Sequence, residues 1–317
     1  MCKSVEIIVP CYNEHEVINM FYERTKNVVS KISKYAFSFI FVDDGSSDST
    51  LFDLQELAKT HSDVKYISFS RNFGKEAAIF AGLSYSKSDY VILMDGDLQH
   101  PPELIPEFVK GMEEGYDSCV ARRSKRAGEH PLRAPFSNVF FNVNNKISTV
   151  KLEKGAVDYR MITRRVVNAV LEMSEKERFS KGLFAWAGFE TKWIEYVSKK
   201  RAAGKTKWSF WGLGIYAVKG LTSFSRAPLI LVTIIGFIIS VVAFVYIIIT
   251  LVQTLIYGID VPGYVTTLCA VLFLGGIIEI SIGILGSYIG HIYMETKNRP
   301  MYVLKTTNID REETSEK

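Results

Sequence analysis

Short apolar runs alternate with stretches of helical periodicity through the first part of the chain. The apolar runs have the length of β-strands and end at turn-forming or charged residues; they lie at residues 5–9, 37–42, 64–69, 90–94 and 118–121. Apolar positions recur with helical spacing at residues 16–33, 49–60, 76–86, 102–111 and 163–173. Strands that alternate with helices are typical of a mostly parallel sheet with helices on both faces. The pattern therefore predicts an α/β domain.

Two long apolar stretches follow this domain. Residues 227–259 contain no charged side chain, and in residues 261–292 the only Asp, Glu, Lys, Arg or His residues are Glu279 and His291. Each stretch is longer than the ~20 residues that cross a bilayer. A buried core helix is the alternative for either one, but two such stretches in succession favour membrane spans. We expect transmembrane helices at residues 227–257 and 262–292.

Basic residues flank these stretches on their outer sides. Lysines and arginines occur at residues 199–226 and 297–305, whereas the connection between the stretches holds Asp260 and neither Lys nor Arg. The positive-inside rule places both termini and the α/β domain in the cytoplasm, as a multi-pass protein of the cytoplasmic (inner) membrane. We also expect an interfacial amphipathic helix at residues 209–226. The cytoplasmic tail, residues 293–317, is expected to be disordered after Lys305.

Composition narrows the range of partners. The net charge is +4, which anionic lipid beside the basic clusters explains better than nucleic acid does. The 4 cysteines have no metal-ligand spacing, so neither a zinc site nor a disulfide framework is expected.

The histidines form no metal or catalytic cluster in the sequence, and none is assigned a role. Glu279 stays open between a functional carboxylate and a helix contact.

Two carboxylates directly follow the apolar run at residues 90–94. Asp95 and Asp97 are separated by Gly96, and Gln99 follows. An open α/β sheet binds its ligands at the carboxyl ends of its strands, and oxygen donors suit Mg²⁺ or Mn²⁺ that carries substrate phosphates. A surface Asp-Gly-Asp turn is the simpler explanation of the tripeptide alone. The buried strand before it and the polar loops after the other strands favour a metal and substrate site.

The other strands also end in charged or turn-forming residues, at 12–14, 43–46, 71–75 and 122–123. The acidic loop at 43–46 suits either the base and ribose of a nucleotide or the cap of the next helix, and the two explanations are even. It is not a G-x-G-x-x-G loop, which disfavours a dinucleotide site. Cations after the last strand suit phosphate oxygens, although a solvated or lipid-facing surface explains part of the set. These cations are Arg122, Arg123, Lys125, Arg126 and Arg133.

The strand-end loops contain three motifs: VPCYNE at residues 9–14, DDGS at 43–46 and DGDLQ at 95–99. They resemble the motifs of the inverting family 2 glycosyltransferases of GT-A fold. Further matches follow in order through nearly the whole chain, at residues 71–76, 157–160, 178–186, 220–225 and 295–300. Together with the two-helix tail, they are similar to the polyprenyl-phosphate branch, which includes dolichol-phosphate mannose synthase and the bactoprenol glucosyltransferases. The resemblance implies a Rossmann-like GT-A catalytic domain at residues 1–208.

The resemblance also implies roles for individual residues. The donor nucleotide would be bound by Pro10, Tyr12, Glu14, Asp43, Asp44 and Lys75. The metal ion, Mg²⁺ or Mn²⁺, would be bound by Asp95, Asp97 and Gln99. The acceptor phosphate would be bound by Arg122, Arg133, Arg160 and Lys205, the last of which would also close on the donor diphosphate. The residues implied to take part in the chemistry are Asp95, Asp97, Asp158 and Arg122.

The activity implied by this resemblance is transfer of one hexose, glucose first, from a UDP-sugar to undecaprenyl phosphate at the lipid bilayer. N-acetylglucosamine, galactose and mannose stay open as the sugar, because the residues that read it cannot be decoded. A non-catalytic membrane subunit of a lipid-sugar pathway stays open as a different class, although it would not need the acidic motif. The product would serve cell-surface glycans, such as cell wall or lipopolysaccharide. A homo-oligomer formed through the two spans is compatible with the pattern.

Overall fold

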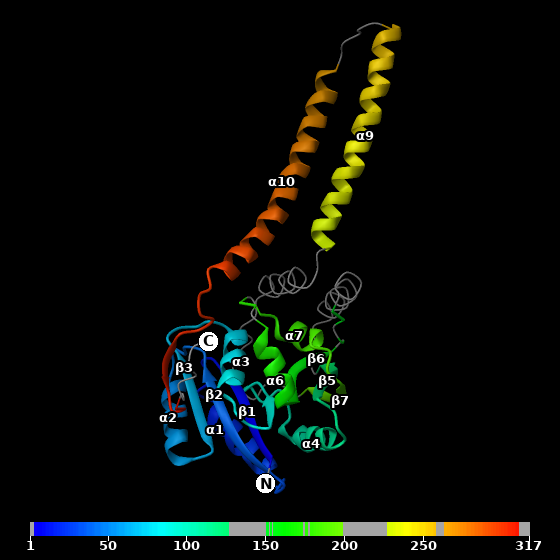
Figure 1. Cartoon of the computed structure of the whole chain (residues 1–317). Helices are drawn as coiled ribbons and strands as arrows, with labels where there is room; N and C mark the ends of the chain where they lie inside the picture. Colours follow the sequence, from blue (N-terminus) through cyan, green and yellow to red (C-terminus); the bar gives the residue numbers. More distant parts are fainter. Residues whose placement is uncertain are drawn as a thin grey trace.

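The computed structural model describes residues 3–126, 150–151, 153, 155–173, 175–176, 178–198, 227–257 and 263–310. They form an α/β domain and two long helices that extend from it side by side (Figure 1). The α/β domain contains β1 (Lys3–Cys11), α1 (Ile18–Val29), β2 (Tyr35–Asp43), α2 (Thr50–Thr60), β3 (Val64–Phe69), α3 (Lys75–Tyr85), β4 (Tyr90–Leu93), η1 (Pro102–Leu104), α4 (Ile105–Glu113), β5 (Ser118–Arg126), β6 (Ala156–Thr163), α6 (Arg164–Glu172), α7 (Ser180–Trp186) and β7 (Thr191–Ser198). The long helices α9 (Ala227–Tyr257) and α10 (Tyr264–Thr296) follow, and then β8 (Leu304–Thr307).

Within the described part of the chain, eight strands form one sheet in the order β7-β5-β6-β4-β1-β2-β3-β8. The central strands β4, β1, β2 and β3 are mutually parallel. Strand β6 runs antiparallel to β4 and β5, and β8 runs antiparallel to β3. The predicted α/β fold with a mostly parallel centre is therefore confirmed. The sequence pattern missed β6, β7 and β8.

The two faces of the sheet carry separate cores because successive residues of a strand point to opposite faces. Ile7 of β1 belongs to the core that includes residues of α1, α2 and α4. Ile8, the next residue, belongs to the core that includes residues of α3 and α6. Both side chains are fully buried, and each such burial contributes about 1.5–3 kcal/mol. The prediction of helices on both faces is confirmed.

The strand order reverses at β1. The chain passes from β1 outward to β2 and β3, and then returns to place β4 on the other side of β1. Such a reversal leaves a crevice at the carboxyl ends of the two central strands, where open α/β sheets bind ligands. Strand β1 begins at the end of the domain farthest from α9 and α10, so the parallel strands run towards these helices (Figure 1).

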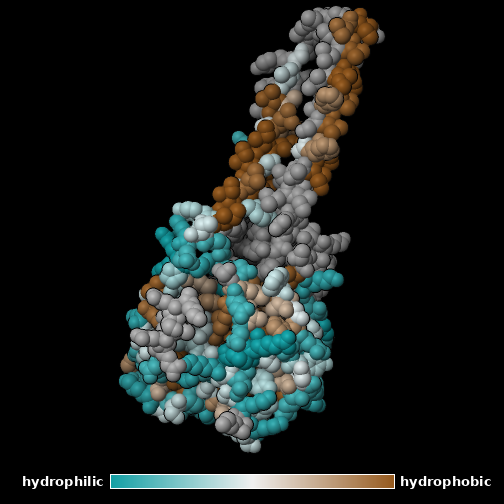
Figure 2. Space-filling model, in the orientation of Figure 1, coloured by the Kyte–Doolittle hydropathy of each residue, from teal (hydrophilic) through white to brown (hydrophobic). Residues whose placement is uncertain are grey.

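Apolar side chains cover the outside of the two long helices, whereas the α/β domain is largely hydrophilic (Figure 2). In the described residues, one helical segment, Phe273–Thr296 in α10, is long and apolar enough to cross a membrane. A shorter apolar segment, Ile234–Tyr246, lies in α9. The helix expected at residues 209–226 lies outside the described residues.

The expectation of disorder after Lys305 is wrong for the described part of the tail. Lys305 lies within β8, which pairs with β3 as far as Thr307. The side chain of Asn308 also accepts a hydrogen bond from the Tyr66 amide at 2.7 Å. The segment is polar, but its backbone is paired with a sheet edge, and that pairing does not require an apolar sequence.

Candidate active site

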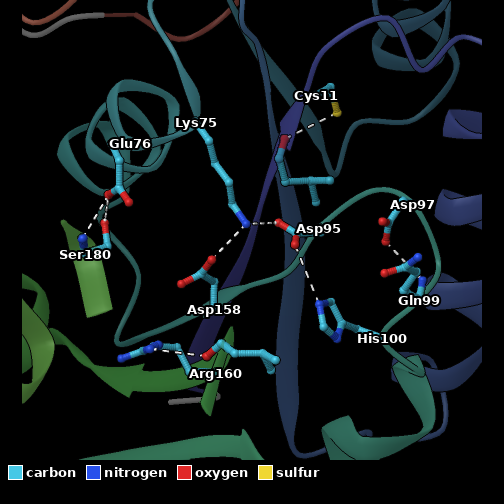
Figure 3. A network of polar contacts seen from close by, with 12 residues as sticks. Cys11, Lys75, Glu76, Asp95, Asp97, Gln99, His100, Asp158, Arg160 and Ser180 are labelled. Carbon is cyan, nitrogen blue, oxygen red and sulfur yellow. Dashed lines mark hydrogen bonds and ion pairs between the residues drawn. The ribbon is translucent and has the colours of Figure 1, made fainter. Parts of the chain in front are cut away.

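A lysine joins two carboxylates at the centre of the candidate site (Figure 3). Asp95 follows β4, Lys75 begins α3, and Asp158 lies on β6, the antiparallel neighbour of β4. Lys75 Nζ is 2.6 Å from Asp95 Oδ1 and 2.9 Å from Asp158 Oδ2. All three side chains are partly buried. Segments that are distant in the sequence thus bring one cation and two anions together.

These contacts keep all three groups charged. Burial disfavours the charged form of each carboxylate, but the charge of Lys75 outweighs this effect and holds the pKa values of Asp95 and Asp158 below their ordinary range. Burial also lowers the pKa of Lys75, but the two carboxylates outweigh it and keep that pKa well above its ordinary value. The cluster therefore carries an excess of negative charge near neutral pH, which suits a cationic ligand.

A histidine contacts Asp95 from the other side. His100 Nε2 lies 3.6 Å from Asp95 Oδ2, and His100 Nδ1 lies 2.7 Å from the Tyr196 hydroxyl of β7. His100 and Tyr196 are both buried. Sequence reasoning assigned no role to His100. The position of His100 directly after Gln99 could have indicated a role at the site. Its contact with Tyr196 depends on the pairing of β7 and could not be predicted from the sequence pattern.

The loop after β4 turns back sharply at Asp97. The Gln99 amide donates a hydrogen bond to Asp97 Oδ1 at 3.0 Å, which closes a turn around this carboxylate (Figure 3). Leu98 has a φ of 55°, in the left-handed region, and its side chain is buried. A Cβ at Gly96 would lie 2.7 Å from Glu14 Oε2. The absence of a side chain at Gly96 therefore lets the β1 and β4 loops pack closely.

The donor set at this loop fits a hard divalent cation. In the described residues, no group of three or more His, Cys, Asp or Glu side chains is arranged to hold a metal ion. Asp95, Asp97 and Gln99 are oxygen donors, and Mg²⁺ in phosphate-transfer sites is held by one or two carboxylates together with water and substrate phosphates. Asp95 is paired with the Lys75 ammonium at 2.6 Å, so an ion held by Asp95 would share this carboxylate with Lys75.

Asp43 and Asp44 are both buried and hydrogen-bonded within the protein. Asp43 accepts hydrogen bonds from the Ser46 amide at 3.0 Å and from the Ser68 hydroxyl at 2.7 Å. Asp44 accepts hydrogen bonds from the amides of Phe73 and Gly74 at 2.7–3.1 Å. Asp44 thus fixes the loop that leads into Lys75, which sequence reasoning did not foresee.

The β1 loop is attached to the β2 loop. The Asn13 amide donates to the Ser46 hydroxyl, and the Glu14 amide donates to the Thr50 hydroxyl, both at 2.9 Å. The Ser47 amide in turn donates to Asn13 Oδ1 at 2.9 Å. Pro10 and Tyr12, on either side of Cys11, lie at this carboxyl end of β1. The predicted donor-binding residues of the two loops are therefore neighbours.

The sequence matches the family described as glycosyl transferase family 2 over residues 6–171. This range includes Lys75, Asp95 and Asp158. CsbB of Bacillus subtilis (strain 168), which has the name of a glycosyltransferase without a stated substrate, is 46% identical over 98% of this chain and 94% of its own.

The chain belongs to glycosyl transferase family 2. Two further relatives of this family 2 enzyme have more specific names. A prophage bactoprenol glucosyl transferase homolog of Escherichia coli (strain K12) is 41% identical over 95% of this chain and 98% of its own. The bactoprenol glucosyl transferase of Shigella phage SfII is 40% identical over 96% of this chain and 98% of its own. The matched range, residues 6–171, includes strands β2 to β4 and the polar loops that follow β1 to β4.

Two arginines of this glycosyltransferase were predicted to bind the acceptor phosphate and lie in different surroundings. Arg122 of β5 pairs with Glu153 at 2.9 Å and with Glu195 of β7, so a phosphate would have to exchange with these carboxylates. Arg160 of β6 is buried, with its guanidinium 4.2 Å from the centre of the Phe184 ring. Its Nε has no hydrogen-bond partner among the described residues. The other two predicted residues, Arg133 and Lys205, lie outside the described residues.

A third carboxylate, that of Glu76, follows Lys75 in the sequence and links α3 to α7. Glu76 accepts hydrogen bonds from the backbone amide and the hydroxyl of Ser180, at the start of α7 (Figure 3). Burial raises the pKa of Glu76, and the charge of Asp158 adds to that effect. The contact attaches α7 to α3 next to Lys75. Sequence reasoning missed Glu76 and Ser180, although Glu76 lies in a motif that carried the resemblance.

The structure therefore brings together Asp95, Asp158 and Lys75, with Asp97 and Gln99 on the adjoining turn. It places Lys75 at the carboxylates rather than in the loops that were predicted to bind the nucleotide. Asp43 and Asp44 lie in hydrogen bonds that organise those loops. The ligand roles assigned to these residues stay predictions.

Proposed function

We propose that this glycosyltransferase transfers glucose from UDP-glucose to undecaprenyl phosphate. The observation that carries the proposal is the position of Asp95 and Asp97 at the carboxyl end of β4, beside the point where the strand order reverses. This is where an α/β sheet binds a nucleotide ligand. The names of the relatives support the choice of sugar and acceptor, since two near-full-length relatives are named for bactoprenol glucosyl transfer.

Asp95, Asp97 and Gln99 would hold Mg²⁺ or Mn²⁺, and the ion would neutralise charge on the donor diphosphate. Lys75 keeps Asp95 ionised and fixes its orientation at 2.6 Å. Asp158 holds Lys75 from the other side at 2.9 Å. Pro10, Tyr12, Glu14, Asp43 and Asp44 would form the donor-nucleotide side of the site.

In the proposed reaction, a phosphate oxygen of undecaprenyl phosphate attacks C1 of the glucose. A bond forms between this oxygen and C1, the bond between C1 and the diphosphate oxygen breaks, and UDP leaves with the electron pair. The acceptor is already an anion near neutral pH, so no strong base has to remove a proton. The protein mainly aligns the two phosphates and stabilises the leaving diphosphate. Arg122 and Arg160, with Arg133 and Lys205, would bind the acceptor phosphate.

The acceptor is a membrane lipid, so the proposal requires the site to lie at a bilayer. We place α9 and α10 as two membrane spans with both termini and the α/β domain in the cytoplasm. The parallel strands run towards these helices (Figure 1). Their carboxyl ends would then face the bilayer surface, where a soluble donor and a lipid phosphate can meet.

A transfer assay tests the proposal. The purified full chain in detergent would be given undecaprenyl phosphate, Mn²⁺ and a panel of radiolabelled UDP- and GDP-sugars. We expect label from UDP-glucose in the organic phase, reduced by roughly 10²-fold or more in Asp97→Asn. Asp89→Asn is the matched control, because Asp89 lies at the opposite end of β4, where its side chain accepts hydrogen bonds from the amide and hydroxyl of Ser4.

Three outcomes would overturn parts of the proposal. Label from another sugar, such as N-acetylglucosamine, galactose or mannose, would replace glucose and leave the reaction class intact. Folded protein that transfers no label from any donor would favour the non-catalytic membrane subunit. Equal activity of Asp97→Asn and Asp89→Asn would contradict the assignment of Asp97 as a metal ligand.

A further inference from the structure

The chain returns to the sheet after the last long helix. Strand β8 pairs antiparallel with β3, with Thr307 opposite Ile67, Thr306 opposite Ser68 and Leu304 opposite Phe69. The Ser70 amide also donates to the Val303 carbonyl at 2.9 Å. In Figure 1 this C-terminal segment, in red, runs beside β3. The paired part of β3 is the part that leads directly into the loop before Lys75.

Side chains attach the two ends of this C-terminal segment differently. At the end near the site, the ring of Tyr302 stacks on Phe69, with 4.7 Å between ring centres and 18° between ring planes. At the far end, Asn308 exchanges hydrogen bonds with the backbone of Tyr66 and Val64, at 2.7 and 3.3 Å. The ring contact of Tyr302 is with Phe69, the last residue of β3 before the loop that leads to the site.

The contact at Phe69 continues into the loop that carries Lys75. The rings of Phe69 and Phe73 are perpendicular to each other, with 5.8 Å between ring centres. The amides of Phe73 and Gly74 donate to Asp44, and Lys75 follows. The loop is thus held by Asp44 on one side and by the aromatic stack on the other. Phe69 is fully buried, and Tyr302 packs on the core that contains it.

We propose that Tyr302 is a positioning residue for the candidate site. Through Phe69 and Phe73 it fixes the loop of residues 70–74, and this loop sets where Lys75 meets Asp95 and Asp158. The segment after the apolar helix α10 is then part of the scaffold of the site. The expected effect on sugar transfer rests on the proposed function, whereas the effect on the loop does not.

A purely structural role for β8 predicts something different. Strand β3 would be an exposed sheet edge without β8, and natural proteins commonly cover such edges. If covering the edge were the only role, damage to either end of the segment would loosen β3 and its loop to a similar extent. If Tyr302 positions the loop, damage to the near end should loosen residues 70–74, whereas damage to the far end should loosen residues 64–66.

Amide hydrogen exchange on the full chain in detergent separates these roles. We expect Tyr302→Ala to increase the exchange of the Phe73 and Gly74 amides about tenfold, since it removes the aromatic stack on Phe69 that helps to keep the loop closed. Tyr302→Phe keeps the ring and should stay within about twofold of the natural chain. Asn308→Ala is the matched control and should loosen residues 64–66 while leaving Phe73 and Gly74 protected.

Three results would overturn the proposal. These are unchanged exchange at Phe73 and Gly74 in Tyr302→Ala, an equal increase there in Asn308→Ala, and a uniform increase over the whole domain. The transfer assay adds a second readout: Tyr302→Ala should lower kcat/KM for the donor about tenfold, with recovery in Tyr302→Phe. If the loop loosens but transfer is undiminished, Tyr302 positions the loop without affecting catalysis. Absence of transfer in the natural chain would count against the proposed function alone, because the exchange data would still decide the role of Tyr302.

Discussion

Lys75 is the residue on which the charge balance of the site depends. Its ammonium lies between Asp95 and Asp158, and it holds the pKa values of both below their ordinary range against the effect of burial. Removing one partner of a buried charge cluster leaves the other charges uncompensated. Loss of this lysine should therefore destabilise the site more than loss of a lysine on an exposed surface, where ion pairs contribute little to stability.

Replacing Lys75 by methionine keeps the length of the side chain and removes its charge. We expect Lys75→Met to lower kcat/KM for sugar transfer by roughly 10²-fold or more, because Asp95 loses its orientation and part of its ionisation. The melting temperature should also fall. Lys75→Arg is the control, since it keeps the charge and should retain more activity. Equal losses in both variants would show that the shape, and not the charge, of Lys75 matters.

His100 offers a second prediction at this scale. His100→Ala removes the contact with Asp95 Oδ2 and the 2.7 Å hydrogen bond with the Tyr196 hydroxyl. Residues that orient metal ligands typically change metal affinity by ~10–100-fold when they are removed. We expect the Mn²⁺ concentration for half-maximal transfer to rise by about this factor. Tyr196→Phe should have a smaller effect, and an unchanged Mn²⁺ dependence of His100→Ala would contradict the role.

The candidate site was predictable where its residues are adjacent in the sequence. Asp95, Asp97 and Gln99 form one short motif after an apolar strand, and their grouping could be read directly. The pairing of Lys75 with Asp158 could not, because it depends on β6 lying antiparallel beside β4. The contact between His100 and Tyr196 likewise depends on β7, a strand that the pattern did not predict.

Among the elements, the loops after β2 and β3 form an interlocked pair. Gly45 has a φ of 65° and packs against the backbone of Arg71, where a Cβ would lie 2.2 Å from the Arg71 carbonyl carbon. Asp44, the preceding residue, binds the amides of the same loop. The conformation of one loop thus determines that of the other, and with it the start of α3.

Gly45→Ala tests this interlock. The new Cβ would be strained by the positive φ and would also clash with Arg71. Gly115→Ala is the matched control: Gly115 also has a positive φ of 99°, but nothing lies within 4 Å of its Cβ position. We expect the melting temperature to fall in both variants and clearly further in Gly45→Ala, as measured by thermal unfolding. Equal shifts would mean that backbone strain alone is responsible and that the loops do not interlock.

Asp44 makes the stability of this loop pair depend on pH. Burial raises the pKa of Asp44 to about 6, although the Phe73 and Gly74 amides act in the opposite direction. Between its ordinary value near ~4 and about 6, the folded chain therefore binds a proton that the unfolded chain has released. The free energy of unfolding falls as pH rises through this window and is independent of this group above it.

Comparison with Asp44→Asn isolates this contribution, because the variant has no proton to bind there. The melting temperature of the natural chain should fall relative to that of Asp44→Asn as pH rises from about 4.5 to about 6.5. The difference should stay constant at higher pH. Parallel curves through the whole window would show that the pKa of Asp44 is not raised.

At the scale of the whole molecule, the fold was predictable where local pattern and tertiary position agree. Strands β1 to β4 are apolar because both faces of the sheet are covered, and each is followed by a helix. Strand β8 could not be predicted from its sequence. It is short and polar, and it is held by backbone pairing to β3, more than 200 residues earlier in the chain.

The pairing of β8 with β3 also constrains the membrane topology. Strands β1 to β7 precede the two long helices, whereas β8 follows them, and all lie in one sheet. The chain must therefore return to the side of the membrane from which it started, so it crosses an even number of times. If the apolar segment of α10 crosses, α9 is the partner that the described residues offer for the second crossing.

This argument predicts the result of a topology experiment on the full chain. A fluorescent protein that matures only in the cytoplasm should fluoresce when it is fused after residue 317, and a reporter active only outside should be active when inserted at residues 258–262. Extraction at high salt and high pH should leave the protein in the membrane fraction, because two apolar helices hold it there. An active external reporter at the C-terminus would require an odd number of crossings. The pairing of β8 with β3 does not allow the C-terminus of a folded chain to lie outside. An active external reporter there would therefore overturn both the two-span topology and the return of the C-terminal segment to the sheet.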